Sequence, residues 1–193
     1  MKKTLILSIL LTFICYTKSF SQYKLKIIFK DGTEKTDTYK AKGWKLTSLT
    51  TDEKFHLNDM KEITYYKDDK SFKYYVIDTK TYVKSKRSKI RLARKAYEGK
   101  NIELYYVYFR WTDGHGTGSF SVNAYDEAFV KKKDEPYAYN MGYIYGFIYE
   151  GIKKRVRVYF KDCPELIQKV NKNKIKKKNT LEMVTFYDQH CGQ

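Results

Sequence analysis

Alternating apolar and polar positions dominate the chain from residue 22 onward. Leu25, Ile27 and Phe29 fall on one face of a strand, and Asp31-Gly32 follows at once. An Asp-Gly pair after a strand is a strong hairpin signal. Shorter apolar runs with the same period of two follow at 44–46, 55–57, 60–66 and 72–77. The pattern predicts antiparallel β structure from residue 22 to about residue 80.

The next segment is basic. Residues 84–95 hold seven cations and no acid, and we expect them to connect two β regions. Ile90, Leu92, Ala93 and Ala96 predict a short helix there, ending at Gly99, because glycine commonly terminates helices.

Residues 101–111 predict a central strand, since both of its faces are apolar or aromatic. The glycine-rich stretch 113–118 predicts a hairpin loop into a strand over 120–125. It lacks the Gly-Lys-Ser/Thr ending and the strand-to-helix context of a phosphate-binding loop, so its glycines indicate turns.

Helical signals gather near the C-terminus. Apolar residues from Ile148 to Phe160 recur at helical spacing and favour a basic amphipathic helix, although Val156 and Val158 also suit a strand. Residues 162–165 have the Asp-x-x-Glu form of a capping box with proline in the first turn, and 179–182 repeat the start signal. The two helices that follow, joined by the lysine-rich turn 172–178, predict an αα-hairpin.

Residues 1–21 have the form of a cleavable secretory signal peptide. Lys2 and Lys3 precede a short apolar stretch, and Ser19 and Ser21 mark a cut before Gln22. An uncleaved anchor is the alternative, but Lys18 interrupts the apolar run before it reaches the ~20 residues of a membrane span. We therefore expect an exported protein that is periplasmic, associated with the outer membrane or extracellular.

Two cysteines, Cys163 and Cys191, remain once the leader is removed. An even pair in an oxidising compartment predicts a disulfide, and two free buried thiols are the alternative. Antiparallel packing of the two C-terminal helices would bring the start of the first helix to the end of the second. The fold prediction is α+β: a mostly antiparallel sheet or partly open barrel over 22–160, with two subdomains meeting near 80–100 as one possibility, and a disulfide-closed helical hairpin over 161–193.

The net charge is +17, of which Lys2, Lys3 and Lys18 lie in the leader, leaving +14. Such a charge favours an anionic partner: anionic polysaccharide, lipopolysaccharide or another polyanion. However, 33 of the 39 cations are lysine, and lysine is less suited than arginine to bidentate recognition of phosphate. A lysine-rich composition with no specific ligand is the alternative.

Tyrosines at odd positions between 137 and 149 would share one face of a continuous strand. Exposed, such a row would stack sugars or nucleobases; otherwise it covers a β core. Together with the basic segment, it supplies the candidate binding residues: Lys84, Lys86, Arg87, Lys89, Arg91, Tyr137, Tyr139, Tyr143 and Tyr145.

The chemistry of an enzyme is not evident in the sequence. The three histidines, His56, His115 and His190, have no partner at metal-ligand spacing, and no Gly-x-Ser-x-Gly motif occurs. We therefore expect no cofactor, no metal and no catalytic residue. A non-enzymatic binding module for an anionic or glycan partner is the first hypothesis. A secreted hydrolase acting on nucleic acid or polysaccharide, built around His115 and Asp113, and a purely structural envelope component are the alternatives.

Four segments resemble uncharacterised secreted proteins of Bacteroidota. They are the leader end at 19–22, 97–105, 159–166 (YFKDCPEL) and 186–191 (FYDQHC). The resemblance covers the leader and roughly the C-terminal half. It implies a Gram-negative envelope or extracellular setting and carries no activity.

Overall fold

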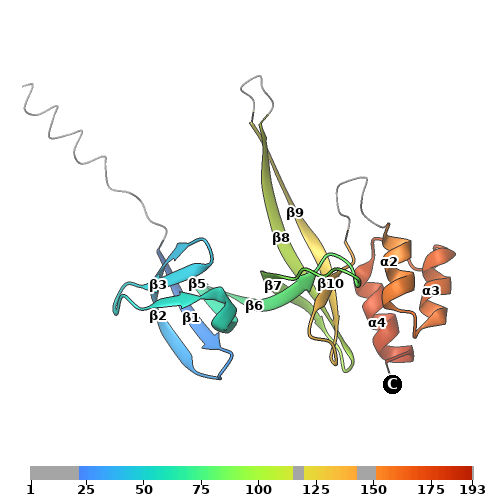
Figure 1. The fold of residues 1–193 in the computed structure, drawn as a ribbon, viewed down its shortest axis with the longest axis horizontal. Coiled ribbons are helices and arrows are strands. Elements are labelled where there is room, and N and C mark those ends of the chain that lie inside the picture. Colours follow the sequence, from blue (N-terminus) through green and yellow to red (C-terminus); the bar gives the residue numbers. More distant parts are fainter. Residues whose placement is uncertain (1–21, 115–119, 143–150, 193) are drawn as a thin grey trace, which may run out of the picture.

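The computed structural model describes residues 22–114, 120–142 and 151–192. The predicted leader lies outside the described residues. Ten strands form one mostly antiparallel sheet, with three short α-helices at one end of the molecule and β1–β5 at the other (Figure 1). The strands are β1 (Gln22–Phe29), β2 (Glu34–Lys42), β3 (Lys45–Ser48), β4 (Lys54–His56), β5 (Met60–Lys67), β6 (Lys70–Lys80), β7 (Lys89–Glu98), β8 (Ile102–Gly114), β9 (Phe120–Lys132) and β10 (Ala138–Asn140). The helices are η1 (Leu57–Asp59), α2 (Ile152–Tyr159), α3 (Pro164–Asn171) and α4 (Thr180–His190).

The first two strands form the predicted hairpin. Gly32 in their turn has φ +87°, and the Asp31 carboxylate accepts hydrogen bonds from the Thr33 amide and hydroxyl. Glycine fits this position because an L side chain rarely adopts positive φ. The predicted strand face is confirmed: Leu25, Ile27 and Phe29 are buried in a small core with residues of β2, η1 and β5.

The middle of the sheet curls into a ring-like arrangement. The strand order is β10-β9-β8-β7-β6-β5-β1-β2-β3-β4, and β10 also pairs in parallel with the end of β6. This pairing brings β6 to β10 around a common interior. The predicted central strand is confirmed, since β8 lies between β7 and β9 and pairs with β9 along its whole described length. Residues 115–119, which include most of the predicted loop, lie outside the described residues.

Side-chain alternation separates two cores along β8 and β9. One face carries Tyr105, Val107 and Phe129, which pack with residues of β6, β7 and β10. The opposite face carries Leu104 and Val130, which pack under the three helices in the largest core. A strand buried on both faces requires the apolar run that predicted it.

The helical end confirms most of the predicted hairpin. α2 forms where the periodicity predicted a helix, and α4 begins at the predicted cap, where the Asn179 side chain accepts a hydrogen bond from the Glu182 amide. The start of α3 is also correct, but its cap residue is Cys163, with no side-chain cap hydrogen bond. The capping-box interpretation of Asp162 is therefore wrong.

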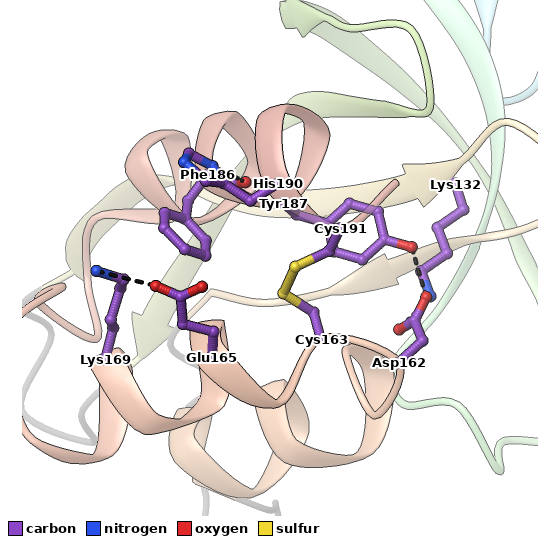
Figure 2. Close-up of a disulfide and its surroundings, with 9 residues drawn as sticks. All are labelled: Lys132, Asp162, Cys163, Glu165, Lys169, Phe186, Tyr187, His190 and Cys191. Atoms are coloured by element: carbon purple, nitrogen blue, oxygen red, sulfur yellow. Dashed lines mark hydrogen bonds and ion pairs between the residues drawn. A yellow bond between two sulfur atoms is a disulfide. The ribbon is translucent and has the colours of Figure 1, made fainter. Parts of the chain in front are cut away.

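Asp162 instead joins the helices to the sheet (Figure 2). Its carboxylate accepts hydrogen bonds from the Tyr187 hydroxyl at 2.5 Å and from the Lys132 ammonium at 2.9 Å. Burial opposes the ionisation of Asp162, but these two partners outweigh it and hold its pKa below the ordinary value. The predicted disulfide is present beside this cluster, linking Cys163 to Cys191 with a Cα–Cα distance of 5.6 Å.

The predicted helix between Ile90 and Gly99 is wrong. Residues 89–98 form β7, which pairs with β6 over its first half and with β8 over its second half. Local helix propensity is weak enough for two flanking strands to override it. Within the described residues, no helix is long and apolar enough to cross a bilayer.

Candidate binding groove

A tight turn presents Trp44 to solvent. β2 and β3 are joined by the two residues Gly43 and Trp44, and Gly43 has φ +59° at the first position of the turn. A glycine at this position is typical of two-residue hairpin turns. The Trp44 carbonyl accepts a hydrogen bond from the Leu57 amide, which ties the turn to η1. The backbone is thus held in place while 58% of the Trp44 residue is exposed.

The structure distributes the predicted basic segment over two elements. Lys84, Lys86 and Arg87 are exposed in the connection between β6 and β7. Lys89 and Arg91 lie on β7, two residues apart, so their side chains leave the same face of the strand. The Thr79 hydroxyl donates a 2.7 Å hydrogen bond to the Lys89 carbonyl and holds the start of β7 against β6.

A groove of about 560 Å³ brings these two regions together. Its walls come from the Trp44 turn, η1, β6 and the start of β7. Ile90 also packs against the N-terminal core, so β7 is held beside the hairpin that carries Trp44. The lining residues are Trp44, Asn58, Asp78, Ser88, Lys89, Ile90 and Arg91.

The groove combines one aromatic face, two cations and several hydrogen-bonding groups. No ion pair joins Asp78 to Lys89 or Arg91 in the part of the chain that the structure describes. With two cations and one acid, the lining residues carry a net charge of +1, and Lys89 is exposed. Ligand sites of this kind use aromatic area for affinity and a few polar groups for orientation.

The Arg91 guanidinium contacts an aromatic side chain inside the ring-like sheet. Its central carbon lies 5.1 Å from the centre of the Phe109 ring, and Phe109 stacks on Tyr125 with ring centres 5.6 Å apart. Such a cation–π contact leaves the planar edge of a guanidinium free to receive a carboxylate. Arg91 is thus the more ordered of the two groove cations.

Beyond Arg91, the interior of the ring holds a buried carboxyl group. Glu127 accepts a hydrogen bond from the Asn140 side chain, and the Arg155 guanidinium donates to the Asn140 side-chain oxygen at 2.7 Å. Burial raises the pKa of Glu127. This network leaves no pattern along the chain, because its three residues come from β9, β10 and α2 and meet only in the fold.

A second buried carboxyl group, Glu103, lies at the start of β8. Burial opposes its ionisation, but hydrogen bonds from Lys95, Tyr105 and Lys133 outweigh burial and lower its pKa. Glu103 is therefore a satisfied ion-pair centre. Its role is to stabilise the ring.

The predicted tyrosine row is only partly described. β10 spans three residues, and Tyr139 within it is buried and packs on Tyr159, with ring centres 5.1 Å apart. Tyr137 is half-buried, and the Lys80 ammonium lies 3.9 Å from the centre of its ring. Tyr143, Tyr145 and Tyr149 lie outside the described residues. Neither described tyrosine lines the Trp44 groove.

Neither of the two described histidines lines the groove. His190 stacks on Phe186, with ring centres 4.3 Å apart, and His56 is exposed on β4. His115, the residue of the hydrolase alternative, lies outside the described residues. Among the residues that the structure describes, no three histidine, cysteine or carboxylate side chains are arranged to hold a metal ion.

No family model matches the chain, and no curated protein or solved structure is similar to it.

Proposed function

We propose that the protein is an exported, non-enzymatic binding module for an acidic polysaccharide, and that the Trp44 groove is its binding site. One observation carries the proposal: an exposed tryptophan shares a groove with Lys89 and Arg91. The indole face packs against the apolar face of a sugar ring, and Arg91 receives the sugar carboxylate as a bidentate partner.

The charge density of the groove favours a glycan over a nucleic acid. A nucleic acid carries one phosphate charge about every 3.4 Å along each strand, and its binding depends on many cations along that backbone. Two cations and one acid, Asp78, suit a polymer with fewer charges and many hydroxyl groups. Asn58, Ser88 and Asp78 supply hydrogen-bond partners for those hydroxyl groups.

The exposed cations beside the groove extend the proposed surface. Lys84, Lys86 and Arg87 lie within four residues of Ser88 along the chain, in the exposed connection between β6 and β7. They attract further carboxylates without fixing their geometry, as lysine-rich surfaces do.

The test is calorimetric titration with a galacturonate oligosaccharide and, as the neutral comparison, its methyl ester of the same length. Trp44→Ala should weaken binding roughly thirtyfold, the effect of losing an anchor worth ~2 kcal/mol. Lys89→Gln with Arg91→Gln should abolish the preference for the free acid over the ester. Lys176→Gln with Lys178→Gln removes the same charge far along the chain and is the matched control.

Equal binding of acid and ester, or equal losses in the groove and control variants, would refute the proposal. The first result would remove the role of Arg91. The second would show that charge anywhere on the protein suffices, which is the behaviour of a diffuse lysine-rich surface.

A further inference from the structure

A dense group of lysines occupies the turn between α3 and α4. We call this surface the basic tip, and it consists of Lys172, Lys174, Lys176, Lys177, Lys178 and Leu181. All six residues are exposed. No acid occurs between Asn171 and Asn179. No ion pair reaches the five lysines from the residues that the structure describes.

The turn holds these lysines in a defined arrangement. α3 ends in a Schellman motif: Asn173 has φ +56°, the Lys174 amide donates to the Lys169 carbonyl at 2.8 Å, and the Asn173 amide donates to the Val170 carbonyl. Ile175, in the middle of the turn, is buried in the helical core. Because Ile175 anchors the turn, the lysines on both sides of it are directed toward solvent.

An exposed apolar residue lies within the basic tip. Leu181, in the first turn of α4, is 44% exposed. It lines a groove of about 430 Å³ together with Lys174, Ile175 and Phe186. A polyanion in water would contact the lysines but offers no apolar region for the leucine. The surface of an anionic membrane can contact both, because lysines attract the headgroups and leucine enters the boundary with the acyl chains.

One acid borders the basic tip. Glu182 follows Leu181 directly, lines the same groove and accepts a 2.8 Å hydrogen bond from the Asn179 side chain. Glu165, on α3, is paired with Lys169. Five lysines outnumber the single Glu182 carboxylate, so the basic tip keeps a net positive charge.

We propose that the basic tip docks on the surface of a membrane rich in anionic phospholipid. The five lysines attract the headgroups, and Leu181 enters the boundary between headgroups and acyl chains. The excess of lysine over arginine fits this partner, because surface attraction depends on point charge and not on bidentate geometry. This inference does not rest on the glycan site, which lies on other elements.

The test is flotation of the chain with vesicles of phosphatidylglycerol and phosphatidylcholine (3:7) against phosphatidylcholine alone. The tip variant replaces Lys172, Lys174, Lys177 and Lys178 with glutamine. Its partition coefficient should fall on the order of a hundredfold, because each lysine near an anionic surface contributes about fivefold at low salt and not all four touch at once. The matched control replaces four exposed lysines at the other end of the molecule: Lys54, Lys61, Lys67 and Lys70.

A second pair of variants isolates the apolar contact. Leu181→Ser should lower partitioning several-fold and remove the part of binding that persists in 0.5 M salt. Leu49→Ser is its control, since Leu49 is similarly exposed at 42% and lies in the β3–β4 connection. Circular dichroism checks that each variant is folded.

Three results would overturn the proposal: no preference for anionic vesicles, equal losses in the tip and control lysine variants, or no effect of Leu181→Ser. Loss of vesicle binding with intact galacturonate binding would separate this surface from the Trp44 groove.

Discussion

The two ends of the molecule differ in how firmly they are tied together. At the helical end, α2, α3 and α4 share the largest core with β8 and β9, and the Cys163–Cys191 disulfide and the Asp162 cluster reinforce it. At the other end, β1 to β5 enclose a small core, and Trp44 is exposed in the turn between β2 and β3. The helical end thus has the larger core and two additional links, and the proposed groove forms where the β1–β5 end meets β7.

This difference shows where stability and recognition reside. Buried aromatic side chains such as Phe160 stabilise the helical end, whereas the exposed aromatic side chain of Trp44 adds nothing comparable to folding. Substitutions in the helical core should therefore change unfolding, and substitutions around the groove should change glycan binding.

Removing the disulfide should produce the largest loss. Replacing Cys163 and Cys191 together with alanine opens a loop with a sequence separation of 28, which costs about 3–4 kcal/mol in the free energy of unfolding. Urea unfolding measures the loss, and the wild-type chain in reductant should match the double variant. A loss below 1 kcal/mol would show that the helical core does not depend on the bridge.

Asp188→Asn should have an intermediate effect. Its carboxylate accepts hydrogen bonds from two backbone amides, at Lys100 and Asn101, and from the Tyr97 hydroxyl at 3.0 Å. Hydrogen bonds to a charged group contribute about 2 kcal/mol, more than those to a neutral group. Urea unfolding at pH 7 should show that loss, while Asp69→Asn, at an exposed position, should show none.

The same variant should change the response to acid. Burial opposes ionisation of Asp188, but its hydrogen bonds outweigh burial and lower its pKa in the folded state. A carboxyl group whose pKa is lower in the folded state than in the unfolded state stabilises the fold when it is ionised. This stabilisation is complete above the unfolded-state pKa of about 3.9 and is lost as pH falls through the folded-state pKa. Asp188→Asn should therefore lose less stability than wild type below about pH 4, and an unchanged acid limb would contradict this role.

Gly43→Ala should have the smallest effect on folding and a clear effect on binding. Alanine at φ +59° is strained, although no atom lies within 4 Å of the added Cβ, so the expected loss is about 1 kcal/mol. The turn that carries Trp44 should shift, and galacturonate binding should weaken more than stability alone explains. Unchanged affinity would show that the turn geometry does not set the position of Trp44.

Local patterns accounted for most of the elements. Period-two alternation predicted antiparallel β structure over residues 22–80, where β1 to β6 lie, the Asp31-Gly32 turn formed as expected, and Asn179 caps α4. The cysteines paired because the two helices they flank are antiparallel neighbours. Each of these features depends on residues that are close in sequence or on a single long-range contact.

The errors and omissions depend on contacts across the fold. The alanines at 93 and 96 favoured a helix, but this segment forms strand β7 because it pairs with β6 and β8. Asp162 accepts hydrogen bonds from Lys132 and Tyr187 and does not cap α3. Trp44 was assigned only to a strand region, because nothing near it in sequence indicates that Lys89 and Arg91 lie across a groove. A site built from four separate segments leaves no periodic signal in the chain.

We propose that glycan recognition is confined to the Trp44 groove. The most direct measurement is a two-dimensional amide NMR titration of the isotope-labelled chain with the galacturonate oligosaccharide at physiological salt. The Trp44 indole N–H and the amides of 88–91 should shift together with one dissociation constant, while those of α3 and α4 stay unchanged. Small shifts spread over lysines at both ends, with no movement of the Trp44 indole, would contradict the account.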